Sequence, residues 1–125
     1  MRSFRKGCRI MFAVGVASIV VVSLLPYPLV YGAFAVSDKI EHAAAYAVVA
    51  LLGAIGFGGW RRQAMLGAGL IALGGTLELA QTLVPGRLAD LADALANGVG
   101  VIAGVAAGRL ISLALEKRRV AARAA

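Results

Sequence analysis

The stretch KIEHAAAYAVVALLGAIGF, from Lys39 to Phe57, decides the fold of this chain. Its polar residues stand near its beginning, and the rest is an apolar run that ends at the sequence GGWRR, which begins at Gly58. A helix of ~20 mainly apolar residues is long enough to cross the ~30 Å hydrocarbon layer of a bilayer. The stretch therefore predicts a membrane-spanning helix whose polar side chains gather at one end.

Three further apolar blocks of similar length flank this stretch. They cover about residues 10–31, with Pro26 and Pro28 breaking or kinking the end, about residues 63–84, and about residues 91–115. The chain is 61% hydrophobic and only 15% charged, which is too little polar surface for a soluble domain of 125 residues. We expect an all-α membrane protein, a single domain over residues 1–125. It would be a bundle of four transmembrane helices followed by a basic cytoplasmic tail over residues 116–125.

The basic residues predict the orientation of the helices. All 13 Lys and Arg residues except Lys39 and Arg87 fall before the first block, between the second and third, or at and after the end of the fourth. Cytoplasmic loops carry an excess of Lys and Arg, so this distribution places both termini in the cytoplasm. Five of the six acidic residues fall on the opposite, extracytoplasmic side: Asp38, Glu41, Glu78, Asp90 and Asp93.

The net charge of +7 does not indicate a nucleic-acid partner, because the basic residues flank apolar blocks and are not interleaved with exposed aromatic residues. The bilayer itself is the expected partner. A single cysteine, Cys8, excludes an internal disulfide and any metal site built from several cysteines.

The first apolar block allows a second interpretation. Basic residues, an apolar run and the sequence Ala33-Phe34-Ala35 together resemble a cleavable signal peptide. The run is longer than the apolar region of a typical signal peptide, and cleavage would leave three helices. Retention of the first helix is therefore favoured, and cleavage stays the alternative.

Polar residues and glycines repeat at helical spacing in three of the blocks. Each block would place its polar residues on one face, and in the third and fourth blocks glycines share that face. The sets are Lys39, His42 and Tyr46 in the second block, Gly67, Gly74, Glu78 and Gln81 in the third, and Asp90, Asp93, Asn97, Gly100, Gly104 and Gly108 in and just before the fourth. Small residues allow helices to approach closely in a membrane, and intramembrane polar groups are costly unless they face the bundle interior. We expect one shared polar pocket, open to the extracytoplasmic surface.

Two chemistries suit this pocket. Lys39, Arg87 and a protonated His42 could hold a phosphate or carboxylate, with the nearby acidic residues orienting the cations. His42 and a desolvated Glu78 could instead act as an acid–base pair. The nearest hydroxyl nucleophile is Ser37, which stands in no recognisable motif. Polar groups that only bond helices together are the simpler alternative, and Arg109 is expected to do no more than reach the interface.

A metal site is disfavoured. His42 with Glu78, Asp90 or Asp93 offers suitable ligand types, but no H-E-x-x-H or similar spacing occurs. We therefore expect neither a metal nor another cofactor.

The same residues resemble the VanZ-like family. The resemblance rests on Asp38-Lys39-x-x-His42-x-x-x-Tyr46, Glu78-x-x-Gln81, Pro85-Gly86-Arg87 and Asp90-x-x-Asp93-x-x-x-Asn97-x-x-Gly100, which cover about half of the chain. It implies a four-helix integral membrane protein of bacteria, in the cytoplasmic membrane. The characteristic polar positions it implies are Asp38, Lys39, His42, Tyr46, Glu78, Gln81, Arg87, Asp93 and Asn97. The best-known member of the family confers low-level resistance to the glycopeptide teicoplanin, but no feature specific to resistance is visible in this sequence.

Three functions follow as hypotheses. The leading one is binding or handling of an envelope lipid, or of its phosphorylated head group, at the outer leaflet by Lys39 and Arg87. The second is an intramembrane hydrolase or transferase acting on a lipid-linked substrate. The third is an accessory subunit that uses its glycine seam to dock a membrane-protein partner or a second copy of the chain.

Overall fold

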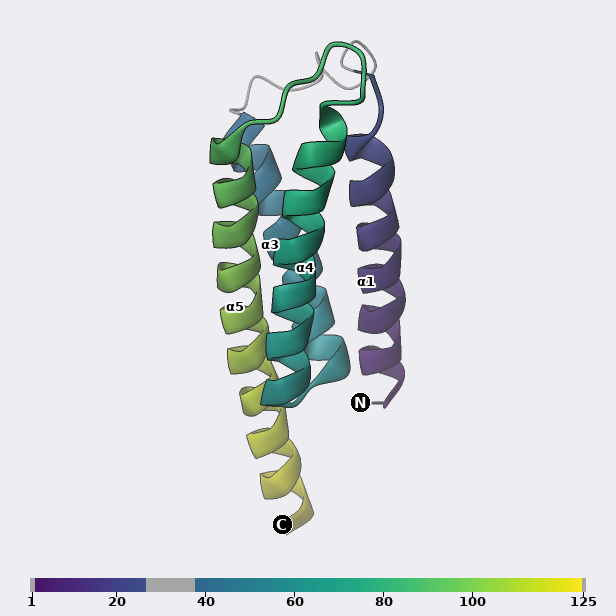
Figure 1. Ribbon diagram of the computed structural model, residues 1–125. Coiled ribbons are helices and arrows are strands. Elements are labelled where there is room, and N and C mark those ends of the chain that lie inside the picture. The colour runs from purple at the N-terminus through teal and green to yellow at the C-terminus, as the bar shows by residue number, and fades with distance from the viewer. Residues whose placement is uncertain (1, 27–37, 125) are drawn as a thin grey trace.

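The computed structural model describes residues 2–26 and 38–124, and this part of the chain is helical without any strand. The helices are α1 (Arg2–Ser23), α3 (Asp38–Phe57), α4 (Trp60–Gln81) and α5 (Leu91–Ala124) (Figure 1). Each of these four is long and apolar enough to cross a membrane. The chain is therefore an all-helical, multi-pass membrane protein.

The helix boundaries differ from the sequence prediction mainly where charged residues flank the apolar blocks. The first helix begins at Arg2, well before residue 10, and the last continues past residue 115 to Ala124. Residues 116–124, which were expected to form a separate basic tail, are therefore helical. Arg, Lys, Ala, Leu and Glu are good helix formers, so the helices continue beyond their apolar parts. The third block starts earlier than expected, at Trp60, and ends earlier, at Gln81.

The end of the first block lies partly outside the described residues. Helix α1 stops at Ser23, shortly before Pro26. Proline lacks a backbone N–H and disfavours the helical conformation in the residue before it, which agrees with this early end. Tyr31, the sequence Ala33-Phe34-Ala35 and Ser37 are not among the described residues.

Helices α3 and α5 pack with their backbones in contact. A methyl group added to Gly100 would collide with the carbonyl oxygen of Ala43, and one added to Gly104 would collide with that of Ala47. One added to Gly108 would lie 2.6 Å from the Cβ of Ala54. The glycine seam of α5 is therefore filled by α3 of the same chain, and this face is not free to dock a partner.

The remaining helices close the bundle around this pair. The core contains Ile19 of α1, Tyr46 and Val49 of α3, Leu70 and Leu77 of α4, and Val101 of α5. Large apolar side chains also cover the outside, for example Met65, Leu79 and Leu110, each about 70% exposed (74%, 70% and 69%). An apolar exterior around a small-residue interior is the arrangement that lipid surroundings favour.

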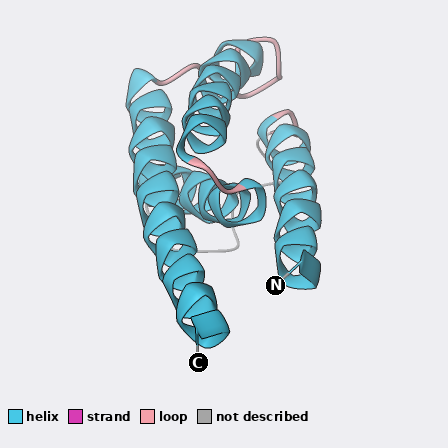
Figure 2. Cartoon of the chain, turned by 90° about the horizontal axis from the view of Figure 1, so that it is seen from below, coloured by secondary structure: helices cyan, strands magenta, loops and turns pink. Residues whose placement is uncertain are grey.

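Helix α1 begins and α5 ends at the same end of the bundle, and the last turns of α5 extend beyond the other helices (Figure 1). Figure 2 shows the molecule from this end. We call it the arginine end, because Arg5, Arg9, Arg61, Arg62 and Arg109 belong to it. The opposite end, where α3 and α5 begin, is called the polar end.

Candidate functional site

Lys39 connects the beginning of α3 to the beginning of α5. Its Nζ lies 3.0 Å from Oδ2 of Asp90 and 3.2 Å from Oδ1 of Asp93. The side chains of Lys39 and Asp90 are half-exposed, whereas that of Asp93 is only 10% exposed. The ammonium group therefore sits at the mouth of the polar end, above a buried carboxylate that it neutralises.

Asp90 caps the N-terminus of α5. Its Oδ1 accepts a hydrogen bond of 2.8 Å from the amide of Ala92, and its carbonyl oxygen accepts bonds from the amides of Asp93 and Ala94. Asp is among the preferred residues at this position because its oxygen satisfies an amide that has no partner within the helix. Lys39, followed by the Ala92 amide, lowers the pKa of the Asp90 carboxyl below its ordinary value, since both stabilise the charged form.

Glu78 connects α4 to the beginning of α5. Its Oε1 accepts a hydrogen bond of 2.7 Å from the amide of Asp90, and its side chain is buried. The carboxylate thus fixes the segment between α4 and α5 and positions the Asp90 side chain for Lys39.

His42 lies one turn below Lys39 and contacts two other residues. Its Nδ1 is 3.1 Å from Oδ1 of the buried Asn97, and its Nε2 is 3.7 Å from Oδ1 of Asp38. An amide oxygen only accepts hydrogen bonds, so Nδ1 carries the proton in this arrangement. The other ring nitrogen, Nε2, faces the Asp38 carboxylate.

The other residues of the expected pocket separate into two groups. Tyr46 and Gln81 are buried, and the Tyr46 hydroxyl packs on Gly74, where an added methyl would lie 3.2 Å from it. Arg87 binds α1, because its Nε donates to the carbonyl oxygen of Leu25 at 3.0 Å and its Nη2 to that of Val22 at 3.3 Å. An arginine at the end of a helix satisfies carbonyls that lack intrahelical partners.

The structure therefore joins most of the expected site residues in two connected sets. One contains Lys39, Asp90, Asp93 and Glu78, and the other contains His42, Asn97 and Asp38. The acid–base pair of His42 with Glu78 is not among the contacts of the described residues, since Glu78 binds the Asp90 amide and His42 faces Asn97 and Asp38.

One grouping of metal-ligand types was missed from the sequence. Asp38, His42 and Asp93 each place one ligand atom within 4.8 Å of the other two. Two carboxylates and an imidazole are ligands that suit several divalent metals. Lys39 already supplies a positive charge to Asp93, however, so the carboxylate has a cationic partner within the chain. The spacing of Asp38 and His42, one helical turn apart, was the available signal.

Polar contacts at the arginine end were also missed. The buried Gln63 donates to the carbonyl oxygen of Ala54 at 2.9 Å and accepts from Nη1 of Arg109 at 3.3 Å. Arg109 therefore bonds α5 to α4 and does more than reach the interface. Arg9 similarly donates from Nε to the carbonyl oxygen of Gly56 at 2.9 Å.

Comparison of the chain with protein-family models, with curated proteins and with solved structures finds no match.

Proposed function

We propose that this chain is a VanZ-like integral membrane protein of the bacterial cytoplasmic membrane that binds the phosphorylated head group of an envelope lipid at the polar end. The observation that supports it is the position of Lys39, whose ammonium group is half-exposed above the buried Asp93. An ammonium group has three N–H donors, and Asp90 and Asp93 use two of them. The third is left for a phosphate oxygen.

The charges support the proposed orientation. The arginine end carries the basic residues that flank α1, α4 and α5, and cytoplasmic segments are enriched in such residues. With that end in the cytoplasm, the polar end opens at the outer leaflet. Lys39 then meets lipid head groups at the level where phosphate lies.

The polar residues below Lys39 support a positioning role. Asp90 and Asp93 fix the ammonium group from two sides, so little of its conformational freedom is lost when it binds an anion. In this proposal Lys39 contacts the phosphate. Arg87 holds the segment between α4 and α5 against the end of α1, through Val22 and Leu25, beside the mouth of the polar end.

A lipid-linked hydrolase or transferase is the second candidate, because His42 has the arrangement of a general base. Asn97 orients the ring through Nδ1, and Asp38 faces Nε2, the nitrogen that would exchange a proton with a substrate. Turnover of a lipid phosphate that disappears in His42→Gln, while binding persists, would favour this enzyme function over binding alone.

The binding proposal can be tested with purified protein in detergent by native mass spectrometry, with dioleoyl phosphatidic acid as the probe. In an Arg5→Gln, Arg62→Gln background, which removes two basic side chains at the arginine end, Lys39→Gln should reduce the fraction of protein carrying the lipid by several-fold, because one charge-assisted hydrogen bond is lost. Lys117→Gln removes the same charge from an exposed site on α5 and serves as the control. Equal binding by both variants would remove Lys39 from the lipid site and overturn the proposal.

A further inference from the structure

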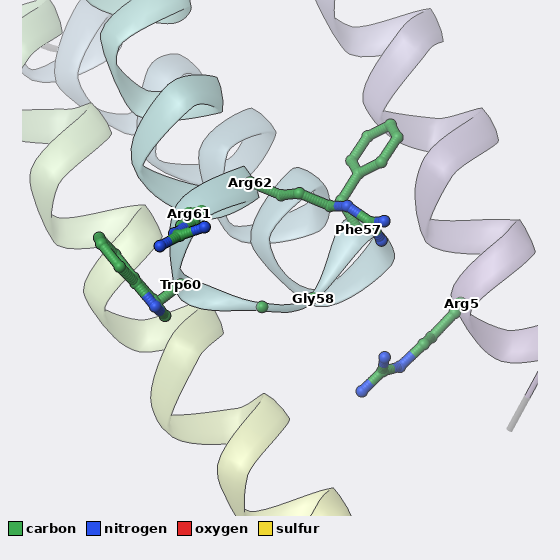
Figure 3. A pocket seen from close by; sticks show the side chains of 7 residues that line it. Arg5, Phe57, Gly58, Trp60, Arg61 and Arg62 are labelled. Atoms are coloured by element: carbon green, nitrogen blue, oxygen red, sulfur yellow. The ribbon is translucent and has the colours of Figure 1, made fainter.

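A hollow of about 470 Å³ lies at the arginine end, where α3 passes into α4 (Figure 3). Its lining consists of Arg5, Phe57, Gly58, Gly59, Trp60, Arg61 and Arg62. Lys39 belongs to the opposite end of the bundle, roughly the length of α4 away, or about 33 Å for its 22 residues. The hollow is thus separate from the site proposed above.

The charges around this hollow are unbalanced. Three of its lining residues are arginines and none is acidic. Helix α4 also begins here with no acidic residue in its first turn and no side-chain hydrogen bond from its N-cap, Gly59. A helix N-terminus carries a partial positive charge and is stabilised by anions, whereas Arg61 and Arg62 add charge of the same sign. Among the described residues Arg5 is paired with Glu116, whereas Arg61 and Arg62 have no acidic partner, so the start of α4 favours a bound anion.

Arg5 is held in position to complete the hollow. Its Nη2 lies 3.0 Å from Oε1 of Glu116, and its Nη1 lies beside Gly58. A methyl added to Gly58 would come within 2.8 Å of that nitrogen, and the φ of +58° at this residue also favours glycine. One side of the guanidinium is thus bound to α5 while the other faces the lining (Figure 3).

Aromatic rings form the rest of the wall. Trp60 is 62% exposed, and the guanidinium of Arg61 lies 5.5 Å from the centre of its ring. Phe57 lines the hollow from the end of α3. Tryptophan is enriched at the level of lipid head groups, and basic pockets between membrane helices bind anionic head groups.

We infer that this hollow binds the phosphate group of an anionic membrane lipid in the leaflet at the arginine end. Arg5 and Arg62 would bond the phosphate oxygens, Arg61 would stay on Trp60, and the aromatic rings would contact the start of the acyl chains. The general excess of basic residues in cytoplasmic segments accounts for the sign of the charge here. It does not account for an open depression beside the turn between α3 and α4 that Arg5 of α1 also lines.

Trp60 provides a local measurement, because it is the only tryptophan in the chain. The protein is reconstituted in phosphatidylcholine vesicles that contain a small fraction of a brominated lipid. This lipid is either phosphatidylglycerol or phosphatidylcholine, and in both the bromine is in the upper part of the acyl chains. Bromine quenches tryptophan fluorescence on contact. Quenching therefore reports which lipid occupies the hollow and is insensitive to binding at Lys39.

Brominated phosphatidylglycerol should quench Trp60 with an apparent affinity about thirty-fold higher than brominated phosphatidylcholine, the factor expected for two arginines at about 1 kcal/mol each near one anionic head group. The double variant Arg5→Gln, Arg62→Gln should lose this preference while Arg61 stays beside the fluorophore. Arg118→Gln, Arg119→Gln removes equal charge from exposed positions of α5 and should keep it.

Two outcomes would overturn the inference. One is equal quenching by the two lipids, or a preference that both double variants lose equally, since this would show attraction by net charge alone. The other is a preference that the Arg5→Gln, Arg62→Gln variant retains in full, since the phosphate group would then be held by other residues. Either outcome would overturn only the lipid site at the arginine end. The lipid-binding test of Lys39 would keep its own result.

Discussion

Glu78 of α4 accepts a hydrogen bond of 2.7 Å from the backbone amide of Asp90, the residue that caps α5. One buried carboxylate thereby determines where the last helix begins and where the Asp90 side chain meets Lys39. The polar end is organised around this bond, in which the partner of the acidic side chain is the main chain.

We expect Glu78→Ala to lower the free energy of unfolding by about 1–3 kcal/mol, because the Asp90 amide loses its acceptor. Glu78→Gln retains an acceptor oxygen and should cost less. Thermal unfolding in detergent measures both. Glu41→Ala, which changes an exposed acidic residue of α3, is the control, and an equal loss in that variant would contradict the role given to Glu78.

The seam between α3 and α5 predicts a second effect. Gly104→Ala should destabilise the protein by about 1–3 kcal/mol, since the added methyl collides with the Ala47 carbonyl and forces the helices apart. Gly98→Ala is the matched control on the same helix, where an added methyl meets no atom within 4 Å. It should be neutral or slightly stabilising because alanine favours helix. Similar melting temperatures for the two variants would argue against the close approach.

The Asp90 carboxyl predicts how stability depends on pH. Lys39 and the Ala92 amide hold its pKa below the ordinary 3.8, so it binds a proton more weakly in the folded than in the unfolded protein. The stabilisation is complete above the ordinary value and is lost as the pH falls through the lowered one. Asp90→Asn keeps a good N-cap residue but does not titrate. The melting temperature should therefore fall less on acidification in Asp90→Asn than in wild type, and identical pH profiles would disprove the coupling.

The orientation can be tested with single cysteines in a Cys8→Ser background. Leu88 at the polar end is 88% exposed, and Lys117 at the arginine end is exposed as well. A membrane-impermeant maleimide should label Leu88→Cys in intact cells, after removal of any outer membrane, and Lys117→Cys only after lysis. Reversed labelling would place the polar end in the cytoplasm and move the proposed lipid site to the other leaflet.

Much of the fold could be predicted because apolar length and helical spacing are local properties. The helix expected over residues 39–57 is α3, Asp38–Phe57, and the glycines Gly100, Gly104 and Gly108 do share one face of α5. The helix ends were less predictable. Charged residues beyond the apolar blocks can stay helical, so those ends carry no local signal. Pro26 and Gly58 do give such a signal, and α1 and α3 end before them.

The contacts of the site could be predicted only in part. Spacing placed Lys39 and His42 on one helix face, but it carries no information on which residue of α5 each would meet. Arg87 was expected beside Lys39, whereas its described partners are carbonyl groups of α1 and the residues that follow it. Pairing between helices depends on their relative rotation and height, and no periodicity within one helix encodes these.

The backbone contact between α3 and α5 has a consequence for biogenesis. These two helices are separated in the chain by α4, so α3 enters the bilayer before its closest neighbour has been synthesised. Until then Lys39 and His42 lack the partners that α5 and its cap supply, namely Asp90, Asp93 and Asn97. The polar contacts of α3 therefore cannot form before the beginning of α5 is present. Maturation of the protein is completed only by the last helix.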